Sequence, residues 1–137
     1  MANGECRGVL LATFKRKFMN RHQSLEDRLV HFAVQVIKLV DTLPNTKTAT
    51  HLGGQLVRSG TAPALNYGEA RSGESRKDFI HKMQIALKEL RESYANLRII
   101  HLAELHPDKQ LIDAALDENN QLISIFVASI NTAKSKL

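Results

Sequence analysis

The sequence predicts an all-α protein, an up-down-up-down antiparallel bundle of four helices. Its 137 residues and 43% hydrophobic content are typical of one small globular domain. Aromatic residues make up only 5% of the chain, Trp is absent, and there are just seven Gly and three Pro residues, whereas β-sandwiches and barrels need frequent turn residues and aromatic or β-branched strands. Four amphipathic stretches complete the prediction, at residues 24–43, 47–71, 75–105 and 107–135.

The N-terminal residues 1–23 differ from the rest, because a short apolar patch and a basic cluster replace sustained periodicity. We expect an arm, either disordered or a short helix, before a bundle that spans residues 24–137. The single cysteine, Cys6, cannot form an internal disulfide and therefore indicates a reducing compartment, so we expect a cytoplasmic protein. No apolar run approaches the roughly 20 residues that span a bilayer, and no membrane partner is expected.

The first two helices are predicted from caps, periodicity and breakers. Ser24 stands three residues before Asp27, a spacing typical of a helix N-cap, and Pro44 ends the first helix. The second stretch contains Gly60 and Pro63, which weaken a helix, but its apolar rhythm continues, so we expect one kinked helix. The apolar face of the first helix consists of Leu25, Leu29, Phe32, Val36, Leu39 and Leu43.

The third and fourth helices follow in the same way. Ser75 and Asp78 repeat the capping spacing, no Gly or Pro interrupts the chain before about residue 105, and Pro107 suits the first turn of the last helix. The last helix carries two adjacent apolar stripes, more than the core of a four-helix bundle requires, and we expect the excess to form a subunit interface. The stripes are Ile112, Leu116, Ile123, Phe126 and Ile130, and beside them Leu111, Ala115, Leu122 and Ile125.

The most specific pattern lies between Gln55 and Ser93. It consists of L-x-R-S-G-T from Leu56, N-x-x-E-A from Asn66 and S-x-x-D-F-I-x-K from Ser75. This pattern resembles the bacterial four helix bundle protein family, which includes proteins encoded in ribosomal-RNA intervening sequences and is similar to the accessory protein of diversity-generating retroelements. The resemblance implies a small cytoplasmic bundle without enzymatic activity that assembles into a ring-like homo-oligomer, by analogy a pentamer.

Polar residues inside this pattern favour a structural role over a catalytic one. We expect them to form a buried or half-buried network that fixes how the second helix meets the third. No nucleophile stands beside a base, and no carboxylate pair has an evident reason for a shifted pKa, so no catalytic residue, cofactor or enzymatic activity is predicted. The four residues of the expected network are Arg58, Asn66, Glu69 and Asp78.

Metal binding is the least favoured interpretation. The six histidines are dispersed, and the repeated Glu-x-x-His pattern of di-iron bundles is absent. The nearest approaches are two single pairs, Asp78 with His81 and His101 with Glu104. We therefore predict no metal site, and a metal-binding bundle enzyme is only a distant third possibility for the function.

The third helix carries the main functional signal. Basic side chains recur on one face at spacings of three, four and seven, separate from its acidic residues, which indicates binding to nucleic-acid phosphates. Because no aromatic residues are interleaved, base stacking and sequence readout are not indicated. A solvated helix face is the simpler alternative, and a protein adaptor or scaffold, such as an accessory subunit of a reverse transcriptase, is the alternative function. The expected contacts to RNA or DNA are Lys77, His81, Lys88, Arg91 and Arg98.

Overall fold

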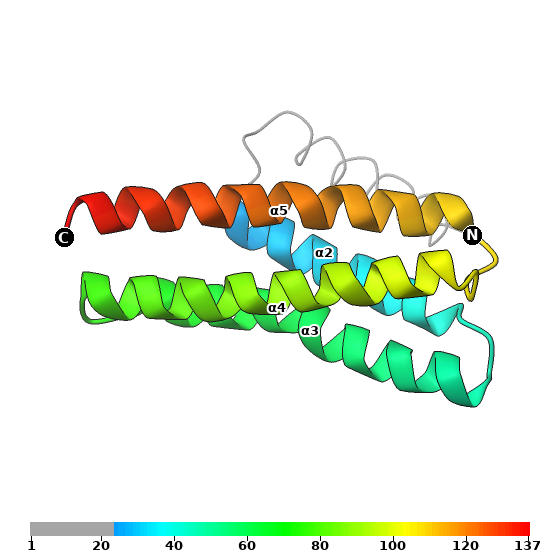
Figure 1. Ribbon diagram of the computed structural model, residues 1–137. Coiled ribbons are helices and arrows are strands. Elements are labelled where there is room, and N and C mark those ends of the chain that lie inside the picture. Colours follow the sequence, from blue (N-terminus) through cyan, green and yellow to red (C-terminus); the bar gives the residue numbers. More distant parts are fainter. Residues whose placement is uncertain (1–23) are drawn as a thin grey trace, which may run out of the picture.

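The computed structural model describes residues 24–137, so the expectations for the N-terminal arm lie outside the described residues. In this range the chain forms four helices and no strands: α2 (Leu25–Asp41), α3 (Lys47–Arg71), α4 (Arg76–Leu102) and α5 (Lys109–Ser135). Successive helices run in opposite directions (Figure 1). Each helix packs against the next along the chain, and α2 also contacts α5. The predicted all-α, four-helix architecture is thus confirmed for the described part of the chain.

The helix starts follow from side-chain caps. The hydroxyl of Ser24 accepts a hydrogen bond from the Asp27 backbone N–H at 3.1 Å, and that of Ser75 accepts one from the Asp78 N–H at 3.1 Å. Both predicted N-caps are therefore confirmed. The last helix begins later than expected, because Asp108 caps it by accepting from the Gln110 and Leu111 N–H groups, which places Pro107 before the cap.

The end of α4 has a turn that the sequence does not predict. Glu104 takes a positive φ of 53°, and the N–H groups of Glu104 and Leu105 bond back to the carbonyls of His101 and Ile100. This pattern is a Schellman motif, in which glycine usually occupies the left-handed position. With glutamate there instead, the sequence gives no stop signal, and α4 ends at Leu102 instead of about residue 105.

The expected single helix through the glycines and Pro63 is present. α3 is continuous, and Figure 1 shows its two halves following different directions. Pro63 has no N–H to bond the Ser59 carbonyl one turn earlier, which accounts for the bend. Ser59, Gly60 and Pro63 are all buried, so this irregular stretch lies inside the bundle rather than at its surface.

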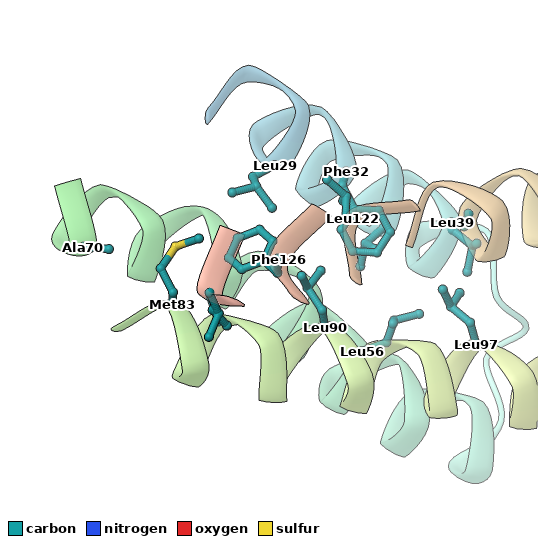
Figure 2. Packing of buried hydrophobic residues seen from close by; sticks show 14 of the residues in the cluster. Leu29, Phe32, Leu39, Leu56, Ala70, Met83, Leu90, Leu97, Leu122 and Phe126 are labelled. Atoms are coloured by element: carbon teal, nitrogen blue, oxygen red, sulfur yellow. The ribbon is translucent and has the colours of Figure 1, made fainter. Parts of the chain in front are cut away.

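The core is a continuous apolar cluster contributed by all four helices. Figure 2 shows Leu29 and Phe32 of α2 pointing toward Phe126 of α5 and toward Met83 and Leu90 of α4. These five side chains are at most 1% exposed. Tyr67 of α3 packs edge-on against Phe126, with ring centroids 6.2 Å apart. The apolar face of each helix therefore points into the same core.

The exposed apolar surface does not lie on α5, where the sequence predicts it. Both stripes of α5 are buried or half-buried, because α5 packs against α4 on one side and α2 on the other. The large apolar side chains that remain exposed include Val30, Val34 and Ile37 of α2, at 49%, 43% and 41%, and none lies on α5. No helix in residues 24–137 is both long and apolar enough to cross a membrane.

Candidate nucleic-acid interface

The outer face of α4 presents the predicted basic row. With 3.6 residues per turn, the five side chains fall within an arc of about 100° on the side opposite the buried face. All five are exposed, and within residues 24–137 none of the four Lys and Arg side chains in the row forms an ion pair. The structure therefore brings Lys77, His81, Lys88, Arg91 and Arg98 together on one solvent-facing surface.

A shallow hollow lies in the middle of this row. It has a volume of about 560 Å³ and is lined by Gln84, Leu87, Lys88, Arg91, Glu92 and Ala95. The lining combines two cations, one carboxylate and a side-chain amide with a short apolar floor. Such a surface can receive a phosphate group at Lys88 and Arg91, but it offers no aromatic ring on which a base could stack.

Glu89 and Glu92 of α4 point toward α3 instead. Arg58 of α3 donates from Nη1 to Glu89 Oε2 at 3.1 Å and from Nη2 to Glu92 Oε2 at 2.7 Å. The hydrogen bond to Glu92 raises the pKa of Arg58, and the same bond lowers the pKa of Glu92. Glu92 is thus held ionised against a cation from the neighbouring helix, Glu89 is bound by the same guanidinium, and the solvent-facing row remains basic.

The four motif residues expected to form one network are not hydrogen-bonded to one another. Arg58 bridges α3 to α4 as described, and Glu69 separately accepts from Lys82 Nζ of α4 at 2.7 Å. Asn66 donates to the Ala62 carbonyl of its own helix at 3.1 Å. Asp78 is exposed in the first turn of α4. Two separate groups of ion pairs, that of Arg58 with two carboxylates and that of Lys82 with Glu69, therefore connect these helices along the α3–α4 edge. They form no shared network, because positions 58 and 69 lie at the surface edge of that interface.

Sequence reasoning missed a buried polar contact between α4 and α5. Asn119 and Ser93 are both fully buried and 2.9 Å apart. In the amide orientation that satisfies both groups, Asn119 Nδ2 donates to the Leu90 carbonyl and Oδ1 accepts from the Ser93 hydroxyl. Both residues stand at positions of the helical repeat that are otherwise apolar. A polar residue within the apolar face of a helix is the only signal of this contact in the sequence. Nothing in this contact suggests chemistry beyond packing.

The histidines do not form a metal centre in residues 24–137, where no group of three or more His, Cys, Asp and Glu side chains is placed to hold an ion. His101 faces Asp113 of α5, with Nδ1 and Oδ1 3.9 Å apart. Glu104, which the sequence paired with His101, lies instead near Lys109 of α5, with Glu104 Oε1 and Lys109 Nζ 3.9 Å apart.

Comparison with known proteins gives two matches and one negative result. The profile of the 23S rRNA-intervening sequence protein family matches residues 21–127. A solved structure with a similar fold is a protein of unknown function from the S23 ribosomal protein family of Bacteroides thetaiotaomicron; it is 28% identical, with a TM-score of 0.72, and the match covers 78% of this chain and 98% of that one. A search of curated proteins found no match.

Proposed function

Because the chain belongs to the 23S rRNA-intervening sequence protein family, and its solved relative has no known function, we propose a function from the surface of the molecule itself. The protein is a non-enzymatic helical bundle that binds the phosphate backbone of nucleic acid along the outer face of α4. The observation that carries this function is the separation of charge on α4, where the basic row faces solvent while Glu89 and Glu92 are bound by Arg58.

The charge of the whole bundle supports the same surface. The helices α3 and α4 carry nine Lys and Arg residues against four Asp and Glu, whereas α2 and α5 carry four against six. A polyanion is therefore attracted to the α3–α4 side. Binding through phosphates is independent of sequence and weakens as salt rises, because it is driven by the release of counterions. The family description mentions 23S rRNA, which makes RNA the first ligand to test.

The decisive experiment measures the binding of labelled RNA and DNA at several salt concentrations. We expect Lys88→Glu with Arg91→Glu to weaken binding by at least about 25-fold at 0.1 M salt, since each lost phosphate contact removes roughly 0.7 to 0.9 from the salt slope. The matched control, Lys109→Glu with Lys134→Glu, makes the same change of charge on α5 and is expected to bind nearly as tightly as wild type. If wild type fails to bind at low salt, the function is not nucleic-acid binding, and the protein-adaptor role, for example beside a reverse transcriptase, becomes the better candidate.

Self-association is the second part of the proposed function. Val30, Val34 and Ile37 form an exposed apolar stripe on α2, and acidic residues stand at both of its ends, Glu26 with Asp27 and Asp41. The C-terminal end of α4 offers the complementary features, exposed Ile99 and Leu102 next to Arg98. We infer that α2 of one copy contacts this end of α4 in the next. A contact between two different surfaces repeats from copy to copy and can close into a ring. The cytoplasmic location stays a prediction from the sequence.

A further inference from the structure

The arginine of the L-x-R-S-G-T motif is not explained by the packing of the core. Its neighbours Ser59 and Gly60 are buried against the rest of the bundle, but 61% of the Arg58 side chain is exposed. An exposed arginine in the most distinctive motif of the chain therefore has a role on the surface. Its only charged partners in residues 24–137 are Glu89 and Glu92 of α4.

One of these partners belongs to the proposed nucleic-acid surface. Glu92 lines the same hollow as Lys88 and Arg91. Lys88 stands one helical turn before Glu92, and its charge already acts on that carboxylate. Side chains four residues apart on a helix are neighbours, and opposite charges at this spacing form ion pairs. Without another partner, Glu92 would therefore pair with Lys88 and occupy a cation that a phosphate needs.

Arg58 prevents this pairing by its geometry. Its planar guanidinium presents parallel donors, and here one nitrogen bonds Glu89 while the other bonds Glu92 at 2.7 Å. The two carboxylates are thereby held toward α3, on the side of α4 away from the centre of the basic row. A lysine at this position would present a single ammonium and could not hold both carboxylates in the same fork geometry.

We propose that Arg58 is a positioning residue of the α4 surface, which keeps Lys88 and Arg91 available to phosphates by holding Glu92 and Glu89 against α3. The role rests on the nucleic-acid binding proposed above. Arg58 itself need not touch the ligand, because it acts through the carboxylates that it binds.

The test is a mutant cycle in the RNA-binding assay, with Arg58→Ala, Glu92→Gln and the two combined. Arg58→Ala is expected to weaken binding about eightfold at 0.1 M salt and to lower the salt slope by about one, as for the loss of one phosphate contact. The combined variant has the net charge of wild type and is expected to bind within about twofold of it. Glu92→Gln should strengthen binding much more in the Arg58→Ala background than in wild type. The control Arg71→Ala removes one charge and one ion pair, that with Glu26, from the far end of α3 and should change binding less than about twofold.

Three outcomes would overturn the role of Arg58. Arg58→Ala could bind like wild type, the combined variant could stay as weak as Arg58→Ala, or Glu92→Gln could have equal effects in both backgrounds, which would show simple addition of charges. In each case Lys88→Glu with Arg91→Glu still tests the surface independently. Both proposals would be removed if wild type failed to bind, or if Lys88→Glu with Arg91→Glu bound as tightly as wild type. Should Arg58→Ala fold poorly in a thermal scan, Arg58→Lys keeps the charge but not the fork, and an intermediate loss of affinity is then expected.

Discussion

His106 is a residue whose role depends on contacts far along the chain. It is 5% exposed in the turn between α4 and α5. Its Nδ1 accepts from the Asp108 N–H at 2.9 Å, so the ring proton sits on Nε2, which lies 3.1 Å from the Leu39 carbonyl and 2.6 Å from the Thr42 hydroxyl. One ring thus joins the end of α2 to the start of α5. The sequence shows only a histidine before a proline.

Replacing this ring should destabilise the fold. We expect His106→Ala to lower the free energy of unfolding by about 2 kcal/mol, because it empties the buried position of the ring and removes the ring's hydrogen bonds to Leu39, Thr42 and Asp108. Urea denaturation followed by circular dichroism measures the change. His51 is exposed on α3, and His51→Ala is the control, with an expected change within about 0.5 kcal/mol. Equal effects of the two substitutions would show that the His106 contacts contribute little.

Glu92 makes the stability of the fold depend slightly on pH in the acid range. Arg58 donates a hydrogen bond to this carboxylate and lowers its pKa, so the folded state holds the proton less readily than the unfolded state. Its contribution is present above the ordinary Glu pKa of about 4.3 and is lost as pH falls through the lowered folded value. Between pH 5 and pH 3, Tm should therefore fall less for Glu92→Gln than for wild type, by about 1–2 °C, as expected of an exposed pair. A parallel fall in both proteins would contradict this.

At the scale of elements, the approach of α2 and α3 is set by glycine. A Cβ added at Gly60 would lie 2.9 Å and 3.0 Å from the two Cγ atoms of Val36, and one at Gly53 would lie 3.0 Å from Val40 Cγ1. At Gly60 a side chain would force Val36 to shift, and at Gly53 Val40 would have to give way by a few tenths of an ångström. Gly54, by contrast, has nothing within 4 Å of its added Cβ. A glycine that weakens a helix in isolation is thus needed for the close approach at Gly60 and merely tolerated at Gly54.

This contrast predicts opposite signs for the same substitution in one helix. Gly54→Ala should stabilise the protein by about 0.5–1 kcal/mol through helix propensity and a less flexible unfolded chain. Gly60→Ala gains the same propensity, but the crowding against Val36 costs about 1–3 kcal/mol, and we expect a net loss of about 1 kcal/mol. Midpoints of urea denaturation compare the two directly. A stabilised Gly60→Ala would mean that Val36 moves aside at little cost.

At the scale of the whole molecule, charge and exposed apolar surface are distributed unevenly. The net charge of +5 is not spread evenly, because residues 1–23 hold five Lys and Arg residues against one Glu. Among the four helices, basic residues predominate on α3 and α4 and acidic residues on α2 and α5. The longest run of exposed large apolar side chains on one helix lies on α2, within the acidic half. Two different surfaces of opposite charge, each with an apolar part, are complementary in the way that favours head-to-tail association of identical copies.

Self-association can be tested by placing a charge in the stripe. We expect wild type to be larger than a monomer in light scattering at micromolar concentration, and Val34→Glu to reduce the mass to that of a monomer, because a carboxylate in an apolar contact loses its hydration without a partner. Ala114→Glu adds the same charge at an exposed position of α5 and should leave the mass unchanged. A monomeric wild type would remove the proposed assembly and leave α4 binding as a property of the single bundle.

The sequence by itself determined which segments are helical and which face of each helix is apolar. Caps at Ser24 and Ser75 marked two helix starts, and the period of α4 separated its basic residues from its apolar ones. These features are local, because a helix repeats every 3.6 residues and its first turn bonds to residues within three positions.

Only the tertiary structure decided which helix faces which. It assigned Glu89 and Glu92 to Arg58, placed the unused apolar surface on α2 instead of α5, and put His106 against the end of α2. Periodicity gives the direction of a side chain around its own helix but not the identity of the neighbour, which depends on the packing of residues about 30 to 70 positions apart. The basic row was readable from the chain, but the arrangement that leaves it free of its own acids was not.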